Sequence, residues 1–324
     1  MHKRFVNHCT IALTIIPDGP ILIKSGKEGA DPTKPDMEFV ETYHAEGRSI
    51  YLPGSSLKGA IRAHAERIVR TVGKDRRDAN NSNLLWANDP LNDKYDYLKD
   101  KSASEIYKLS CFTDRMFGNT SIASRVRIED AYPVDPKQVK VEERNGVAID
   151  RIFGSVAVGP FNYQVCTAGE FHTKIHLKNF SLAQLGLIGL VLRDLNDGWF
   201  GLGFAKSRGL GTVQVNLNSA VVQYPGCEVR DGQICTLGGQ QQWSHTTLLG
   251  AGEFLSAQEA ADYGFPKPDR QEPDQQETPV AAESMALGFG VQLRWTGNGE
   301  AGVSDLFARA VKSWSHLLQG GAAA

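Results

Sequence analysis

Two aspartates stand among phosphate-binding residue types in the segment from residue 23 to residue 36, which reads IKSGKEGADPTKPD. Asp31 and Asp36 lie beside cations that attract a phosphate, whereas a carboxylate repels it. Such an acid is useful where it does chemistry, by activating a 2′-hydroxyl or holding a divalent cation next to a phosphodiester. The alternative is a loop of solvated charges with Asx turns. The phosphate-binding candidates in this segment are Lys24, Ser25, Lys27 and Lys34.

A second phosphate-binding pattern spans residues 52–62, LPGSSLKGAIR. A Pro-Gly turn precedes two serines, and we expect Ser55 or Ser56 to cap the helix that follows. The first turn of a helix carries partial positive charge and unpaired N–H groups, and Lys58 and Arg62 follow one turn apart. The pattern predicts a phosphate site. Its alternative is a well-capped amphipathic helix with solvated cations.

A third pattern is the glycine-rich run at residues 201–211, GLGFAKSRGLG. Glycine permits positive φ angles and lets backbone amides approach a polyanion closely. The run is neither a Walker loop nor a dinucleotide fingerprint, because it lacks the spacing of both. A glycine-rich hairpin without a ligand is the alternative. The candidate binding residues are Lys206, Ser207, Arg208, Gly209 and Gly211.

The elements that must position these patterns are read from hydrophobic periodicity. Residues 5–16 alternate as a strand, a helix runs from the serine turn to about residue 72, and residues 182–195 form an apolar helix. Further strands are expected at 49–52, 124–128, 161–177 and 211–215, with a projecting hairpin at 139–153. Mixed strands and helices in this order predict an α+β fold.

Composition divides the 324 residues into one large domain, a linker and a C-terminal element. Residues 1–255 form the domain, with a polar surface insertion at 73–110; residues 256–284 are rich in acids, prolines and glutamines and predict a disordered linker. Residues 285–324 carry a strand and a helix. Five irregularly spaced cysteines and no apolar run of 18 residues predict a reduced, cytoplasmic protein that does not enter a membrane.

Charge is distributed unevenly along the chain. The net charge is −2, so the total does not indicate a nucleic-acid partner. Residues 54–77, however, hold seven basic residues against two acids, a local balance of +5. Because local patches decide where a polyanion lies, the charge pattern is compatible with nucleic-acid binding at the serine-turn helix.

The pair LPGSSLKGAIR and GFAKSRGLGTVQV, in this order, resembles the RAMP superfamily of CRISPR-associated proteins over about residues 5–215. Together with PDMEFVET before the helix, it resembles the backbone subunit of type III effectors, which coats the guide RNA. The resemblance implies a modified RNA-recognition-motif (ferredoxin-like) fold with a thumb hairpin at 139–159. It implies guide RNA, target RNA and other effector subunits as partners in a hetero-oligomeric complex.

The resemblance also assigns expected roles to residues. Guide phosphates would be held at the serine-turn helix and the glycine-rich run, and Ile149 or Ile152 of the thumb would wedge between bases. Such contacts track phosphates without reading sequence, as a protein indifferent to guide sequence requires. The expected RNA-binding set is Lys24, Ser25, Ser55, Ser56, Lys58, Arg62, Arg125, Arg144, Arg151, Lys206, Ser207, Arg208, Gly209 and Gly211.

Target-cleaving members of that family use an aspartate in the loop after the first strand. The stretch PDMEFVET places Asp36 at this position, with Val40 aligned and Thr42 where a second acid stands in the family pattern. Asp31 is the competitor in the same loop. Magnesium is the expected cofactor for cleavage, and we expect no resident metal site.

Three other functions stay open from the sequence. The first is a purely structural guide-binding subunit in which Asp36 is inert. The second is a guide-processing endoribonuclease, for which His64 in the first helix would be the catalytic histidine. The third is a ferredoxin-like enzyme outside CRISPR systems that binds a phosphate-containing ligand.

Overall fold

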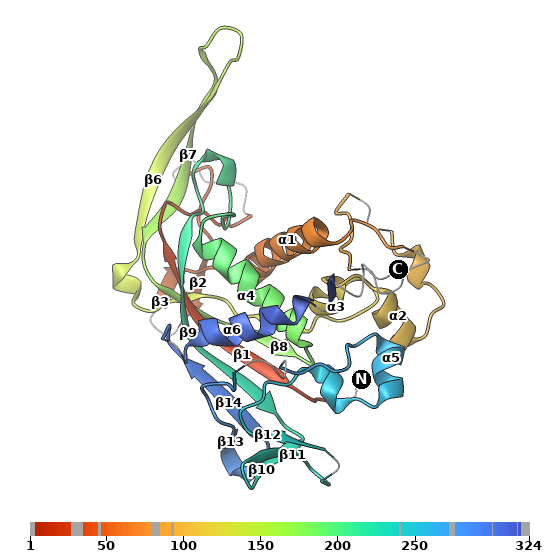
Figure 1. Ribbon diagram of the computed structural model, residues 1–324. Coiled ribbons are helices and arrows are strands. Elements are labelled where there is room, and N and C mark those ends of the chain that lie inside the picture. Colours follow the sequence, from red (N-terminus) through yellow and green to blue (C-terminus); the bar gives the residue numbers. More distant parts are fainter. Residues whose placement is uncertain are drawn as a thin grey trace.

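The computed structural model describes residues 4–26, 35–44, 47–78, 85–91, 94–239, 241–271, 276–299, 301–315 and 317–318. Its centre is a seven-stranded, antiparallel sheet (Figure 1). In spatial order the strands are β13 (Glu283–Ser284), β14 (Val291–Thr296), β9 (Val213–Tyr224), β1 (His8–Pro17), β8 (Phe171–Lys178) and β4 (Val126–Ile128), with β5 (Tyr132–Pro133) also beside β8.

Taken in sequence order and leaving out the elements between them, four of these strands and two helices are β1–α1–β4–β8–α4–β9. Helix α1 is Gly54–Val72 and α4 is Leu182–Asn196. The four strands lie side by side in the order β9-β1-β8-β4. This strand-helix-strand-strand-helix-strand order is compatible with a ferredoxin-like fold. The predicted α+β class is confirmed.

The two faces of the sheet differ because side chains alternate along each strand. In β1, Cys9, Ile11 and Leu13 are buried, and in β8 Ile175 and Leu177 are buried with them. Helices α1, α4 and α6 (Val303–Lys312) contact this apolar side (Figure 1). Most alternate residues of both strands, among them His8, Thr10, His176 and Lys178, are polar and form the open face of the sheet.

The C-terminal element belongs to the same core as the rest of the chain. Strand β14 pairs with β9, and α6 packs against α4. The two helices approach closely at Gly189, where an added Cβ would lie 2.5 Å from the ring of Phe307. Trp314 Nε1 donates a hydrogen bond to Ala183 O. Strand β14, helix α6 and Trp314 are therefore part of the central domain.

The expected disordered linker at 256–284 is wrong for the residues described there. Helix α5 (Ala257–Tyr263) begins with a capping box between Ser256 and Glu259, and β13 joins the sheet. Phe265 is buried and its ring stacks 5.4 Å from Tyr107. The acid-rich composition predicted disorder incorrectly, because a few long-range apolar contacts hold the segment against the rest of the protein. Composition alone does not show such contacts.

The insertion at 73–110 supplies the partner for that segment. It contains a 3₁₀ turn (Asp96–Leu98) and α2 (Ala103–Leu109), followed by α3 (Asp114–Phe117). Tyr107 of α2 packs with Ile122, Ala251 and Leu255 in a second, smaller apolar cluster. The segment therefore does more than cover the surface, because it builds a core of its own against α5.

The other described strands form small sheets. Strands β10 (Cys227–Arg230), β11 (Gln233–Thr236) and β12 (Gln242–Ser244) form one, and β2 (Glu41–His44) with β3 (Gly47–Ile50) another. Strands β6 (Lys140–Ile149) and β7 (Val156–Ala168) form a long hairpin that projects from the body (Figure 1). In the described part of the chain, no helix has the length and apolar character needed to cross a membrane.

Asp269 makes stability depend on pH. Its carboxylate accepts hydrogen bonds from Leu182 N at 3.0 Å, at the start of α4, and from Gly252 N at 2.9 Å. Burial raises the pKa of Asp269 to about 7, so the folded chain binds this proton more tightly than the unfolded chain. The resulting stabilisation is complete below about pH 4 and is lost as pH rises through about 7.

We therefore expect the free energy of unfolding to fall by roughly 4 kcal/mol from this group between pH 4 and pH 8. Urea titrations at several pH values would measure it. Asp269→Asn removes the titrating group, and the difference between wild type and variant should change with pH by that amount. A difference that is constant with pH would contradict the assignment.

Candidate nucleic-acid interface

Residues 20–22 join the glycine-rich run to the projecting hairpin. Ile21 exchanges two backbone hydrogen bonds with Cys166 of β7, at 2.9 and 2.8 Å. Leu22 O accepts from Phe204 N at 2.7 Å, and Pro20 O accepts from Gly211 N at 2.8 Å. A segment directly after β1 therefore holds two elements that are far apart in sequence.

Two glycines make this close packing possible. An added Cβ at Gly203 would lie 2.2 Å from Leu22 O, and one at Gly211 would lie 2.3 Å from Leu202 O. Both residues also have positive φ angles, 78° and 96°. These two glycines thus allow the base of the loop to pack closely. The cations lie at the tip of the loop.

The tip of the glycine-rich run is exposed and basic. Lys206, Ser207, Arg208 and Gly209 are all exposed around a short 3₁₀ turn. The Arg208 guanidinium lies 5.1 Å from the centre of the Phe204 ring. Cations at a glycine-flanked turn can contact a polyanion without displacing protein partners.

Asp36 lies at the base of the hairpin. It is exposed, and its Oδ2 accepts a hydrogen bond from the backbone N–H of Asn162 in β7 at 2.9 Å. The next residue, Met37, forms a parallel bridge with Tyr163. Phe39 N donates to Gln164 Oε1 at 3.0 Å. The carboxylate is thereby tied to the hairpin, a relation that the sequence did not predict.

The cations expected near Asp36 are partly described. Lys24 is exposed and forms a backbone bridge with Phe39, and Ser25 N donates to Glu38 O at 3.0 Å. These backbone contacts place residues 24–25 beside residues 38–39, which closely follow Asp36. Asp31, Lys27 and Lys34 lie outside the described residues.

The hairpin of β6 and β7 carries exposed apolar side chains toward its tip. Ile152 and Phe153 are 84% and 83% exposed, and Ile149 is 55% exposed. Asp150 Oδ1 accepts from the N–H groups of Ile152 and Phe153 and so shapes the turn. Arg151 lies in this turn and Arg144 along β6, where it pairs with Glu142 at 3.7 Å. The hairpin extends to Ala168, beyond the expected bounds of 139–159.

The start of α1 differs from the expected serine cap. The helix begins at Gly54 after Pro53, without a side-chain cap from Ser55 or Ser56. Gly54 N instead donates to Asp130 Oδ1 at 2.7 Å. An acid from the segment after β4 replaces the serine cap, because the chain packs there. Ser55 is consequently exposed in the first turn.

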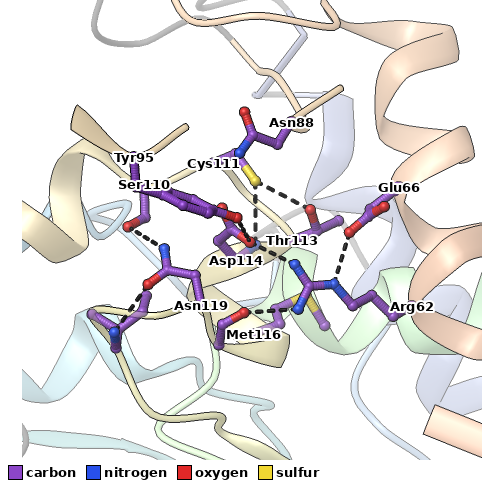
Figure 2. Close-up of polar contacts among 12 residues, drawn as sticks. Arg62, Glu66, Asn88, Tyr95, Ser110, Cys111, Thr113, Asp114, Met116 and Asn119 are labelled. Atoms are coloured by element: carbon purple, nitrogen blue, oxygen red, sulfur yellow. Dashed lines mark hydrogen bonds and ion pairs between the residues drawn. The ribbon is translucent and has the colours of Figure 1, made fainter. Parts of the chain in front are cut away.

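Arg62 lies within a network between α1 and the segment that begins with α3 (Figure 2). Its Nε is 2.8 Å from Glu66 Oε1, its Nη2 is 2.7 Å from Asp114 Oδ1, and its Nη1 donates to Gly118 O at 2.8 Å. Hydrogen bonding and the charge of Glu66 outweigh burial and raise the pKa of Arg62. The guanidinium is thus occupied by protein acceptors.

Lys58 and Arg125 meet at a separate place, a basin beside the first turn of α1. Lys58 Nζ donates to Ser124 Oγ at 2.8 Å, and burial lowers the pKa of Lys58. Arg125 is buried, donates to Asn179 O and stacks 4.1 Å from the centre of the Tyr107 ring. Ser55, Lys58 and Arg125 of the predicted binding set therefore lie at this basin. Arg62 lies outside both the basin and the hairpin-base region.

The structure does not support a catalytic role for His64 of the first helix. His64 is buried, its Nε2 lies 2.8 Å from Asp194 Oδ2, and its ring stacks 4.3 Å from Phe200. It is therefore a core histidine, inaccessible to an RNA strand. Within the described ranges, no three His, Cys, Asp or Glu side chains gather as a metal site.

Residues 14–214 match the family model of the RAMP superfamily. The chain belongs to the RAMP superfamily. No curated protein matches the chain. The matched range of this RAMP protein contains Asp36, the hairpin, the glycine-rich run and the segment at residues 20–22 that connects them. RAMP membership suggests a CRISPR-associated, RNA-binding subunit.

Sequence reasoning missed several basic side chains of this RAMP protein. His8, Arg127, His176 and Lys178 line the basin with Lys58. Their signal was present in the alternation of β8, which places His176 and Lys178 on one face of the strand. That alternation could not show which residues of the neighbouring strands lie beside these side chains.

Proposed function

We propose that this chain is a guide-RNA-binding backbone subunit of a type III CRISPR effector and that it cleaves the complementary target RNA with Asp36. One observation carries the proposal. The glycine-rich run, the Asp36 segment and the hairpin base are bonded to one another through residues 20–25 and β7. A phosphate-binding loop, a carboxylate and a projecting hairpin thus share one region.

Guide binding is the role of the exposed cations. Lys206, Arg208 and Lys24 present positive charge from backbone segments that are held rigidly at their bases. Such contacts go to phosphates and carry no sequence information, so any guide sequence is accepted. The cations can bind RNA without breaking a buried ion pair, in contrast to Arg62.

The hairpin acts as the thumb. Its tip exposes the apolar side chains of Ile149, Ile152 and Phe153 to solvent. Apolar wedges unstack neighbouring bases and kink a nucleic-acid duplex. A kink at the hairpin would turn the target strand toward the hairpin base, where Asp36 lies.

Asp36 supplies the acid–base chemistry. The Asn162 N–H fixes Oδ2, and Oδ1 has no hydrogen-bond partner among the described residues. Oδ1 can therefore accept the proton of a target 2′-hydroxyl, whose oxygen then attacks the adjacent phosphorus. A 2′,3′-cyclic phosphate forms as the bond from phosphorus to the 5′-oxygen breaks, and the departing 5′-oxygen takes a proton from water. A single carboxylate also fits magnesium, which proteins often bind through one or two carboxylates and substrate phosphates. When bound, magnesium would stabilise negative charge on the phosphate.

The binding role is tested by removing both loop cations. We expect Lys206→Ala/Arg208→Ala to weaken binding of single-stranded RNA about 10-fold or more at moderate salt. The slope of log affinity against log salt should fall by about 1.4, because roughly 0.7 is lost for each phosphate contact. Fluorescence anisotropy with a labelled RNA over a salt series measures both quantities.

The matched control is Arg230→Ala/Lys312→Ala, which removes two exposed cations from β10 and α6. It keeps the same net charge as the loop variant and should leave the salt slope unchanged. If both double variants lose affinity equally, the loss reflects net charge, and the glycine-rich run is not the guide site.

A further inference from the structure

A cationic basin lies where the open face of the sheet meets the start of α1. Its volume is about 540 Å³, within the range of roughly 300–1,000 Å³ typical of small-ligand sites. It is separate from the hairpin base, since none of its lining residues belongs to the glycine-rich run, the Asp36 segment or β7. The lining residues that the argument uses are Phe5, His8, Lys58, Arg127, His176 and Lys178.

Cations reach the basin from three elements. Lys58 comes from α1, Arg127 from β4 and Lys178 from β8. Glu129 faces the same side and pairs with Arg127 Nη2 at 3.0 Å and with His176 Nε2 at 2.8 Å. Together with the buried Arg125, four basic side chains line the basin against this one carboxylate, and the excess positive charge favours an anion.

An aromatic row lies beside these cations. The rings of His8 and His176 are stacked with centroids 5.6 Å apart, and Phe5 lies 5.6 Å from His8. His8 is on β1 and His176 on β8, the adjacent central strands of the sheet. Phe5 is 49% exposed. Burial lowers the pKa of His8 and so favours the neutral ring, which can stack against a base.

We propose that this basin holds one nucleotide of a single-stranded RNA segment. The base stacks on Phe5 and His8, and its phosphate contacts Lys178, Arg127 and Lys58. Rings on the two central strands of an open βαββαβ sheet are a known way to stack unpaired bases. Cations flanking a ring platform add the phosphate contact that such stacking needs. The assignment rests on the proposed RNA-binding function and extends it to the open sheet face.

The ring contact is tested with the full chain and a labelled oligouridylate. We expect His8→Ala to weaken RNA binding about 5- to 100-fold, as loss of one stacked base does. His8→Phe keeps a flat ring and should retain most of the affinity. His172→Ala is the matched control, because His172 lies on the same face of β8 but does not line the basin.

Photocrosslinking of 4-thiouridine RNA to the wild-type protein gives a second readout. It does not depend on whether a variant folds. Crosslinks should map to Phe5 or His8. Absence of crosslinks there, or equal loss in His8→Ala and His172→Ala, would overturn the proposal. Uridine 5′-monophosphate should bind far more weakly than the oligomer; comparable affinities would make the basin a free-nucleotide site and overturn the strand assignment.

The test of the basin and the test of the guide site at the glycine-rich run can fail independently. If Lys206→Ala/Arg208→Ala binds RNA normally while His8→Ala does not, the guide site at the glycine-rich run fails and the basin stands. If the loop variant loses affinity and His8→Ala retains it, the basin fails and the guide site stands.

Discussion

Asp36→Ala should slow cleavage of a complementary target RNA by the assembled effector about 100-fold or more, with target affinity unchanged. A positioned acid–base group contributes roughly 10²–10⁴-fold to such a rate. Asp36 is exposed and negative, so its removal takes away no attraction for RNA. Single-turnover cleavage of labelled target, together with a binding titration, measures the two effects separately.

The control for charge is Asp262→Ala, which removes an exposed acid from α5. It should cleave at the wild-type rate. A chelator adds a second arm: if magnesium takes part, EDTA abolishes the same cut that Asp36→Ala removes. An unchanged cut pattern in Asp36→Ala would contradict the catalytic role and identify a scaffold subunit, unless Asp31→Ala then removes the cut.

Arg62→Met should lower the free energy of unfolding by about 3–5 kcal/mol, because it leaves a buried charge without its partner. Asp114 is fully buried and accepts from Arg62 Nη2 at 2.7 Å, and Glu66 shares the same guanidinium (Figure 2). Urea unfolding measures the loss. If Arg62 were chiefly a phosphate ligand, the same change would weaken RNA binding and leave stability nearly intact.

The pH dependence of that loss identifies the buried carboxylate. Burial raises the pKa of Asp114, so the group is protonated more readily than an exposed aspartate. Without Arg62 the pKa rises further, and the destabilisation should shrink as pH falls toward 5, since a neutral carboxyl needs no cation. Arg67→Met, on the exposed side of the same helix, is the control and should change stability by less than about 1 kcal/mol.

The local elements were largely predictable. The predicted strand at 5–16 and the predicted helices from the serine turn to about residue 72 and at 182–195 correspond to β1, α1 and α4 within a few residues. The linker prediction at 256–284 failed because Phe265 and Asp269 are buried by partners near residues 107, 182 and 252. Local composition contains no record of such partners.

The sequence by itself determined the local elements that we propose to bind phosphate, because glycine spacing, helix starts and strand alternation are local properties of the chain. Only the tertiary structure decided which cations are available. Arg62 and Lys206 look equivalent in sequence, yet Arg62 is held by Asp114 from 52 residues away and Lys206 is exposed. Long-range hydrogen bonds likewise place Asp36 against the hairpin, 126 residues distant in sequence. Burial and partnership arise from packing, which no single segment contains.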